Sequence, residues 1–313
     1  MRRVRTAVVQ DAPVAFDREA TLEKVALLLD RAVESGAELV VFPEAFISGY
    51  PKGFDFGAVV GARTPAGRAL FRRYHDSALD VPGPALDWIC ERVRRAGVHV
   101  VLGVIERERG TLYCTVLFLA PDGQLLGKHR KVVPTAMERL IWGQGDGSTL
   151  TAVKTPLGTI GSVICWENYM PFMRVAMYAR GVQLYCAPTV DDRDVWVSSM
   201  RHIAVEGRCF VLSACQFARR GDYPADVENR LSQDPAATLI RGGSLIADPF
   251  GELLAGPVYD KADILVADLD LARIPEGKFD LDVVGHYSRP DIFSFSIDET
   301  PRGVLLPPGD RSE

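Results

Sequence analysis

The segment Gly158–Ala187 has the sequence GTIGSVICWENYMPFMRVAMYARGVQLYCA. Residues 158–165 and 182–187 are rich in apolar residues and predict two buried strands. Pro171 stands where a helix over 171–180 would begin, since proline fits the first turn of a helix. A strand, a helix and a second strand in succession are typical of α/β proteins, whose helices pack against a sheet.

The same alternation extends outward over most of the chain. In the N-terminal half the patterns predict a strand at 4–10, a helix at 17–35, a strand at 37–42, a helix at 84–97, a strand at 99–105 and a hairpin of 112–120 and 124–128. In the C-terminal half they predict a helix at 195–206, a strand at 209–217 and a hairpin of 244–247 and 253–258. The whole chain is therefore predicted to have an α/β fold.

The chain shows neither a Pro/Ser-rich linker nor a sharp change of composition. We therefore expect a single domain over residues 1–295. Residues 218–237 are polar and predict a loop within it. Residues 296–313 form a proline-containing C-terminal tail that we expect to be extended or partly disordered.

The composition is that of an ordinary globular protein and limits the classes of partner. The 313 residues include 36 Lys and Arg against 41 Asp and Glu, a formal net charge of −5. An acidic balance argues against nucleic acid or an anionic membrane as the main partner. No apolar run approaches 18 residues, and the run at 6–9 is too short for a signal-peptide core, so we expect a cytoplasmic protein.

Cys165 stands out among six scattered cysteines, which as a group suggest free thiols in a reducing compartment. It lies between a predicted strand and a helix, where a thiol would be exposed at the sheet edge and the helix N-terminus would favour the reactive thiolate. The alternative is a buried thiol that serves as a small hydrophobic side chain. That is our interpretation of Cys90, Cys114, Cys186, Cys209 and Cys215.

A nucleophilic cysteine needs a base, and none of the five histidines has a local pattern that identifies one. A cysteine protease with a histidine base is therefore unsupported. A carboxylate and a lysine can serve a thiol instead. Glu44 ends a predicted strand, where an acidic side chain is costly unless used or paired, and Lys131 lies in a basic run. Taken singly, each also fits a solvated polar residue.

Three segments taken together are more specific. They are Val41-Phe42-Pro43-Glu44-Ala45-Phe46, His129-Arg130-Lys131-Val132-Val133-Pro134-Thr135 and Val163-Ile164-Cys165-Trp166-Glu167-Asn168. They resemble the three signatures of the carbon–nitrogen hydrolase superfamily, in the order of that family. The flanking segments 49–53, 138–148, 187–189, 206–211 and 285–290 resemble its nitrilase branch, and the resemblance covers residues 4 to about 295. Ala136, Cys114 and Cys215 depart from patterns common in the family, and these departures concern the substrate preference rather than the reaction.

The resemblance implies an α/β fold that forms a four-layer αββα sandwich after dimerisation. It implies hydrolysis of an organic nitrile to a carboxylic acid and ammonia through a covalent cysteine thioimidate and thioester. The implied catalytic residues are Glu44, Lys131, Cys165 and Glu138, and the candidates for substrate binding are Trp166, Tyr50 and Trp142. No metal or organic cofactor is implied. A homodimer or a larger homo-oligomer, such as a spiral, is expected.

Other interpretations remain open from the sequence. An amidase or a carbamoylase of the same superfamily would use the same triad, and a scaffold that has lost catalysis would keep only the fold. The presence of all four expected catalytic residues argues against the scaffold. Glu167 follows the nucleophile closely, but we interpret it as a structural, ion-paired residue.

Overall fold

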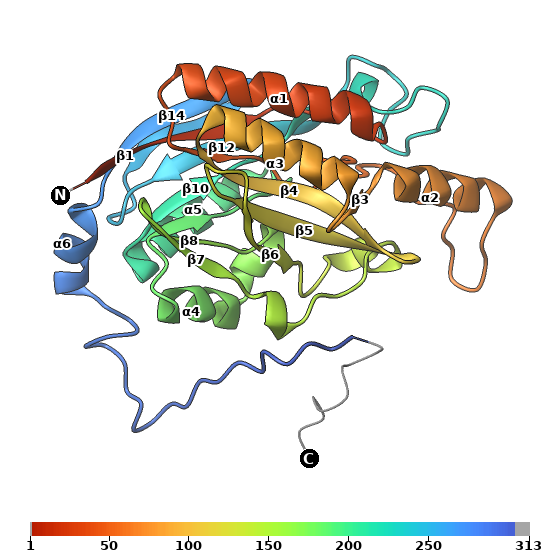
Figure 1. Cartoon of the computed structure of the whole chain (residues 1–313). Helices are drawn as coiled ribbons and strands as arrows, with labels where there is room; N and C mark the ends of the chain where they lie inside the picture. The colour runs from red at the N-terminus through yellow and green to blue at the C-terminus, as the bar shows by residue number, and fades with distance from the viewer. Residues whose placement is uncertain (1, 304–313) are drawn as a thin grey trace.

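The computed structural model describes residues 2–303, which contain two seven-stranded sheets (Figure 1). The first sheet has the order β14-β1-β2-β4-β5-β6, with β3 paired to β4. Its strands are β1 (Arg3–Gln10), β2 (Leu39–Val41), β3 (Leu79–Asp80), β4 (His99–Glu108), β5 (Thr111–Leu119), β6 (Leu125–Arg130) and β14 (Asp263–Asp270).

The second sheet has the order β11-β12-β10-β9-β8-β7, with β13 paired to β12. Its strands are β7 (Ala152–Thr155), β8 (Gly158–Ser162), β9 (Leu184–Cys186), β10 (Phe210–Ser213), β11 (Phe217–Arg219), β12 (Thr238–Ala247) and β13 (Leu253–Tyr259). The α-helices are α1 (Arg18–Glu34), α2 (Pro65–Ser77), α3 (Pro84–Ala96), α4 (Pro171–Ala179), α5 (Asp194–Gly207) and α6 (Arg273–Asp280).

The two sheets pack face to face between two layers of helices. In β1, Ala7 and Val9 belong to the core shared with α1 and α3, whereas Val8 belongs to the core between the sheets. This alternation follows from the two-residue period of a strand. On the far side, α4 and α5 share a third core with the second sheet. The predicted αββα sandwich is thus confirmed, and its four layers form within one chain, without a partner.

The strand predicted at 158–165 is shorter in the structure. β8 ends at Ser162, and Cys165 opens a short 3₁₀-helix, η3 (Cys165–Tyr169). Cys165 has a φ of 50°, in the left-handed region, so the chain turns sharply at this residue. A turn between strand and helix at Cys165 was expected, but the early end of the strand was not, because Val163 and Ile164 are as apolar as the residues before them.

Two helices and three strands were not predicted: α2, α6, β3, β7 and β14. β14 pairs antiparallel with β1 along its whole length, from Arg3↔Asp270 to Gln10↔Asp263. α2 is rich in arginine and buries little, but Gly67 allows a close approach to Phe56, because a Cβ there would lie 2.0 Å from the Phe56 carbonyl oxygen. β14 therefore depends on a distant partner strand and α2 on a close backbone contact, rather than on an apolar pattern of their own.

The predicted loop at 218–237 begins with the end of β11 and a short 3₁₀-helix, η4 (Arg220–Asp222). Its Asn229 is buried and donates to the Lys52 carbonyl at 2.7 Å. The tail has no helix or strand over 296–303, and residues 304–313 lie outside the described residues. Within 2–303, no helix combines the length and apolar character needed to cross a bilayer.

Candidate active site

Four residues that the sequence singles out come together between the sheets. Glu44 lies beyond the end of β2, and Lys131 follows β6 directly, so the first sheet supplies both. Glu138 lies in a 3₁₀-helix, η1 (Ala136–Leu140), and Cys165 opens η3 after β8 of the second sheet. All four side chains are buried, with exposed fractions of 8% or less.

Lys131 lies between two carboxylates. Its Nζ donates to Glu44 Oε1 at 2.6 Å and to Glu138 Oε2 at 2.8 Å. The same Glu138 oxygen accepts from the Thr135 backbone N–H at 2.6 Å, which ties Glu138 to the start of η1. The Lys131 ammonium lies 5.6 Å from the centroid of the Trp142 indole ring. The cluster therefore holds one cation against two acids in a dry site.

The charges in this cluster determine its protonation. Burial alone would lower the pKa of Lys131, but the adjacent Glu44, Cys165 and Glu138 raise it well above its usual value. Burial raises the pKa of Glu44, while the charge of Lys131 opposes that rise. Lys131 therefore stays an ammonium at neutral pH, and Glu44 is a better proton acceptor than an exposed carboxylate.

One oxygen of Glu44 is free for chemistry. Oε1 accepts a hydrogen bond from Lys131 and lies 3.6 Å from the Cys114 thiol. Oε2 is buried and has no hydrogen-bond partner among residues 2–303. The Gln216 side chain donates to the Glu44 backbone carbonyl at 2.7 Å and fixes that segment. A buried carboxylate oxygen without a partner is costly unless it serves a reaction.

Cys165 is held from several sides. Its N–H donates to the Pro188 carbonyl at 2.9 Å, and the Thr189 hydroxyl lies 3.2 Å from Sγ. The Asn168 side chain donates to the Cys165 carbonyl at 2.8 Å. The thiol is only 4% exposed, so the prediction of an exposed thiol is wrong: the adjoining loops cover the sheet edge.

The predicted bias of Cys165 toward thiolate is also wrong. Burial and the charge of Glu44 raise the pKa of the thiol, and Lys131 offsets this only in part. Desolvation and the charge of Glu44 therefore outweigh the attraction of the Lys131 ammonium for a thiolate. The resting group is a neutral thiol, which needs an adjacent base to become a nucleophile.

Tyr50 and Trp142 lie next to Glu138. The Tyr50 hydroxyl donates to Glu138 Oε1 at 2.8 Å, and the two aromatic rings meet edge to face with centroids 5.6 Å apart. Both line a cavity of about 270 Å³ together with Glu138 and the apolar side chains of Met137, Leu140, Ile141 and Leu231. Tyr50 and Trp142 thus border a cavity beside Glu138, and their role in substrate binding stays a prediction.

Trp166 directly follows Cys165 in η3 and is 42% exposed. Its indole N–H donates to Asp191 at 2.8 Å, and the Arg193 guanidinium stacks 4.9 Å from the ring centroid. Among the described residues, the Trp166 backbone N–H has no acceptor in the hydrogen-bond network. This amide is therefore available beside the nucleophile.

Glu167 has the structural, ion-paired position that we expected. Its side chain lies 2.9 Å from His129 Nε2 and is fully buried. Sequence reasoning gave no site role to Thr189, Asn168 and Gln216, which contact the catalytic candidates. A signal exists for two of them, because Thr189 and Gln216 are polar residues beside or within predicted apolar strands.

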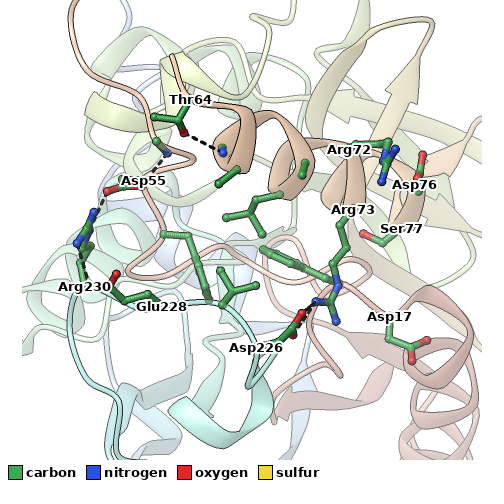
Figure 2. A pocket seen from close by; sticks show the side chains of 18 of the residues that line it. Asp17, Asp55, Thr64, Arg72, Arg73, Asp76, Ser77, Asp226, Glu228 and Arg230 are labelled. Carbon is green, nitrogen blue, oxygen red and sulfur yellow. Dashed lines mark hydrogen bonds and ion pairs between the residues drawn. The ribbon is translucent and has the colours of Figure 1, made fainter. Parts of the chain in front are cut away.

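A larger cavity of about 950 Å³ lies elsewhere, between α2, the start of α1 and the loop at 226–230 (Figure 2). Arg73 pairs with Asp226 at 2.8 Å, and Arg230 pairs with Asp55 at 2.8 Å, across this cavity's walls. Neither the acids of the cluster nor Lys131 nor Cys165 lines it. Because none of the catalytic candidates lines this cavity, it does not form part of the candidate site.

Comparison with known proteins identifies the family. The model of the carbon-nitrogen hydrolase family matches residues 5–279. The chain belongs to the carbon–nitrogen hydrolase family. An aliphatic nitrilase of Sinorhizobium fredii is 56% identical over 306 residues, which cover 98% of this chain and 99% of the relative. A bifunctional nitrilase/nitrile hydratase of Nicotiana tabacum is 55% identical over 298 residues, which cover 94% of this chain and 86% of the relative.

These relatives confirm the expected nitrilase branch of the family. A crystal structure of a carbon–nitrogen hydrolase from Helicobacter pylori G27 superposes with a TM-score of 0.72. The superposition covers 93% of this chain and 97% of the Helicobacter chain at 20% sequence identity, and so shows the shared fold.

Proposed function

We propose that this chain is a nitrilase that hydrolyses an organic nitrile to a carboxylic acid and ammonia, with Cys165 as nucleophile. The observation that carries the proposal is Lys131, buried between Glu44 and Glu138 beside a neutral thiol. Its relatives named as nitrilases, more than half identical over nearly the whole chain, support the same reaction.

In the first half of the reaction, Glu44 takes the proton of the Cys165 thiol. The free Oε2 suits this task because no other group in the described chain competes for it. The sulfur adds to the nitrile carbon, and the nitrogen takes up the proton, which gives a thioimidate. The Lys131 ammonium and the Trp166 backbone N–H stabilise the charge that develops.

In the second half, Glu44 activates water. The water adds to the thioimidate carbon, the nitrogen gains further protons, and ammonia leaves as the C–N bond breaks. The remaining thioester is attacked by a second water, which releases the carboxylic acid and returns the thiol. In this scheme Glu138 holds Lys131 in place, and Tyr50 orients Glu138 through its 2.8 Å hydrogen bond.

We place the organic group of the nitrile against Tyr50, Trp142 and Trp166. The cavity beside Glu138 is mainly apolar, which favours an uncharged substituent. The Sinorhizobium relative is named an aliphatic nitrilase, so aliphatic nitriles are the first substrates to test.

The test is a panel of nitriles and matching amides, with ammonia, acid and amide measured side by side. A nitrilase releases ammonia and acid from nitriles faster than from the amides. Faster turnover of amides or carbamoyl compounds would favour the alternative, an amidase or carbamoylase. The amide is measured as well, because the tobacco relative is named for both activities and the tetrahedral intermediate can expel thiolate instead of ammonia.

Further properties are part of the same proposal. Residues 1–295 form one domain, the protein acts in the cytoplasm, and the reaction uses no metal or organic cofactor, so a chelator leaves the rate unchanged.

The chain forms a homodimer, or a larger assembly such as a spiral, through α4 and the C-terminal segment. Phe172 of α4 is 74% exposed and stacks on Phe295, which supports this surface. Size-exclusion chromatography with light scattering measures the assembly.

A further inference from the structure

His129 and Glu167 form a buried pair next to the catalytic candidates. Neither side chain is exposed, and His129 Nε2 lies 2.9 Å from Glu167 Oε2. His129 belongs to β6, two residues before Lys131, and Glu167 belongs to η3, two residues after Cys165. The pair therefore joins the two segments that carry the lysine and the thiol.

The Glu167 carboxylate accepts a backbone hydrogen bond from each of these segments. The Ile164 N–H donates to Oε2 at 2.7 Å, and the Val132 N–H donates to Oε1 at 2.6 Å. Ile164 directly precedes Cys165, and Val132 directly follows Lys131. One carboxylate thus holds the backbone beside both reacting residues.

Both ring nitrogens of His129 face hydrogen-bond acceptors. Its Nδ1 lies 3.1 Å from the Thr149 carbonyl oxygen, which can only accept, so Nδ1 carries a hydrogen. Its Nε2 faces a carboxylate, which also accepts. A neutral imidazole has only one N–H, so both contacts are satisfied when His129 is an imidazolium and Glu167 is ionised. Burial would raise the pKa of Glu167, but the His129 charge and the backbone donors more than offset this and lower it.

The turn at Cys165 needs such support. A non-glycine residue holds a left-handed φ, here 50°, only when the surrounding structure fixes it. One anchor is the bond from the Cys165 N–H to the Pro188 carbonyl at 2.9 Å. The hydrogen bond from the Ile164 N–H to the Glu167 carboxylate anchors the residue before Cys165. The same carboxylate also binds the Val132 N–H in the Lys131 segment.

We propose that His129 and Glu167 are positioning residues for nitrile hydrolysis. The buried imidazolium orients the carboxylate, and the carboxylate sets the separation between the Lys131 ammonium and the Cys165 thiol. This inference rests on the proposed function, since it takes these two groups as the reacting ones. Neither His129 nor Glu167 contacts the substrate in this account.

Three full-length variants test the proposal: Glu167→Gln, His129→Leu and His129→Gln. Leucine leaves the carboxylate without its partner, whereas glutamine can keep one N–H toward it. A misplacement of about 1 Å at a reacting centre can lower a rate roughly 100-fold. We expect Glu167→Gln and His129→Leu to lower kcat by about that factor with KM nearly unchanged, and His129→Gln to recover at least about a tenth of the parent kcat.

Glu106→Gln is the matched control. Glu106 is equally buried and binds Lys128 and Arg130 of the same strand, β6, but it touches none of the catalytic candidates. We expect this variant to lower the melting temperature while kcat stays within a few-fold of the parent. A similar kcat loss in Glu106→Gln would show a general effect of a lost buried carboxylate and would overturn the proposal.

Folded Glu167→Gln and His129→Leu variants with kcat near the parent value would also overturn it. If Glu167→Gln does not fold, the two His129 variants decide, because equal kcat with glutamine and leucine contradicts an orienting imidazolium. The proposed function fails separately, if Cys165→Ala releases ammonia as fast as the parent in the same assay.

Discussion

The ammonium nitrogen of Lys131 lies 2.6 Å from Oε1 of Glu44, and neither side chain is exposed to solvent. A buried charge that loses its partner is strongly destabilising, since its desolvation is no longer compensated. Lys131→Met leaves Glu44 and Glu138 together without their cation. We expect a loss of about 3–5 kcal/mol in the free energy of unfolding.

The same replacement removes the cation that stabilises the developing charge, so we expect kcat to fall about 100-fold or more. Denaturant unfolding and ammonia release measure the two effects. Lys128→Met is the control, because Lys128 of β6 pairs with Glu106 of β4 outside the catalytic cluster and is 26% exposed. A Lys131→Met enzyme as active as the Lys128→Met enzyme would contradict the assigned role.

Glu44→Gln tests the general base with little change of shape. The amide cannot accept the thiol proton, so we expect turnover to fall by about 10² or more. KM and the folded state, measured by circular dichroism, should change little. Retention of more than a tenth of the parent turnover would assign the base elsewhere.

The pH dependence of kcat/KM follows from the protonation of the same pair. Burial raises the pKa of Glu44 above 4.5, so the base becomes protonated, and activity is lost, as the pH falls through a value higher than 4.5. Burial would lower the pKa of Lys131, but its acidic neighbours raise it well above 10.5, so Lys131 causes no loss on the alkaline side below that value. A rate profile with its acid limb at or below pH 4.5 would contradict the role of Glu44.

Tyr50→Phe removes the hydroxyl that donates to Glu138 Oε1 at 2.8 Å. A hydrogen bond to a charged group contributes about 1.5–3 kcal/mol, so we expect kcat to fall roughly tenfold as Glu138 becomes less well oriented. Tyr74→Phe is the control, because the Tyr74 hydroxyl is buried and donates to the Gly49 carbonyl rather than to an acid of the site. Equal kcat losses in the two variants would argue against an orienting role of Tyr50.

Much of the fold could be predicted because its signals are local. The helix at 18–34 has an apolar stripe and an Asp17 cap that accepts from the Ala20 N–H, and Gly97 ends the helix at 84–96 with a left-handed φ of 67°. β14 is different, because its place beside β1 depends on a partner about 260 residues away. Such pairing leaves no clear mark in either strand alone.

The candidate site likewise has features that local sequence predicts and features that depend on distant packing. Glu44 and Cys165 stand at the ends of predicted apolar strands, whereas Lys131 lies in a basic run after a predicted hairpin strand. The structure brings all three together. The burial of Cys165 could not be predicted, because it results from Pro188 and Thr189, which lie more than 20 residues away. Desolvation then raises the pKa of the thiol, a consequence of packing rather than of local sequence.

Two thiols lie near Glu44, and we expect only one of them to react. Cys114 Sγ lies 3.6 Å from Glu44 Oε1, yet our account gives catalysis to Cys165. Replacing each with alanine removes a thiol of the same size from the same buried region. Cys186→Ala, in β9, shows the effect of losing a buried thiol away from Glu44.

The most direct measurement is therefore ammonia release from a nitrile by Cys165→Ala, compared with Cys114→Ala, Cys186→Ala and the parent under identical conditions. Our account predicts no release above background from Cys165→Ala, and more than a tenth of the parent rate from each of the other two. Release by Cys165→Ala at the parent rate, or its loss only in Cys114→Ala, would contradict the assignment of the nucleophile.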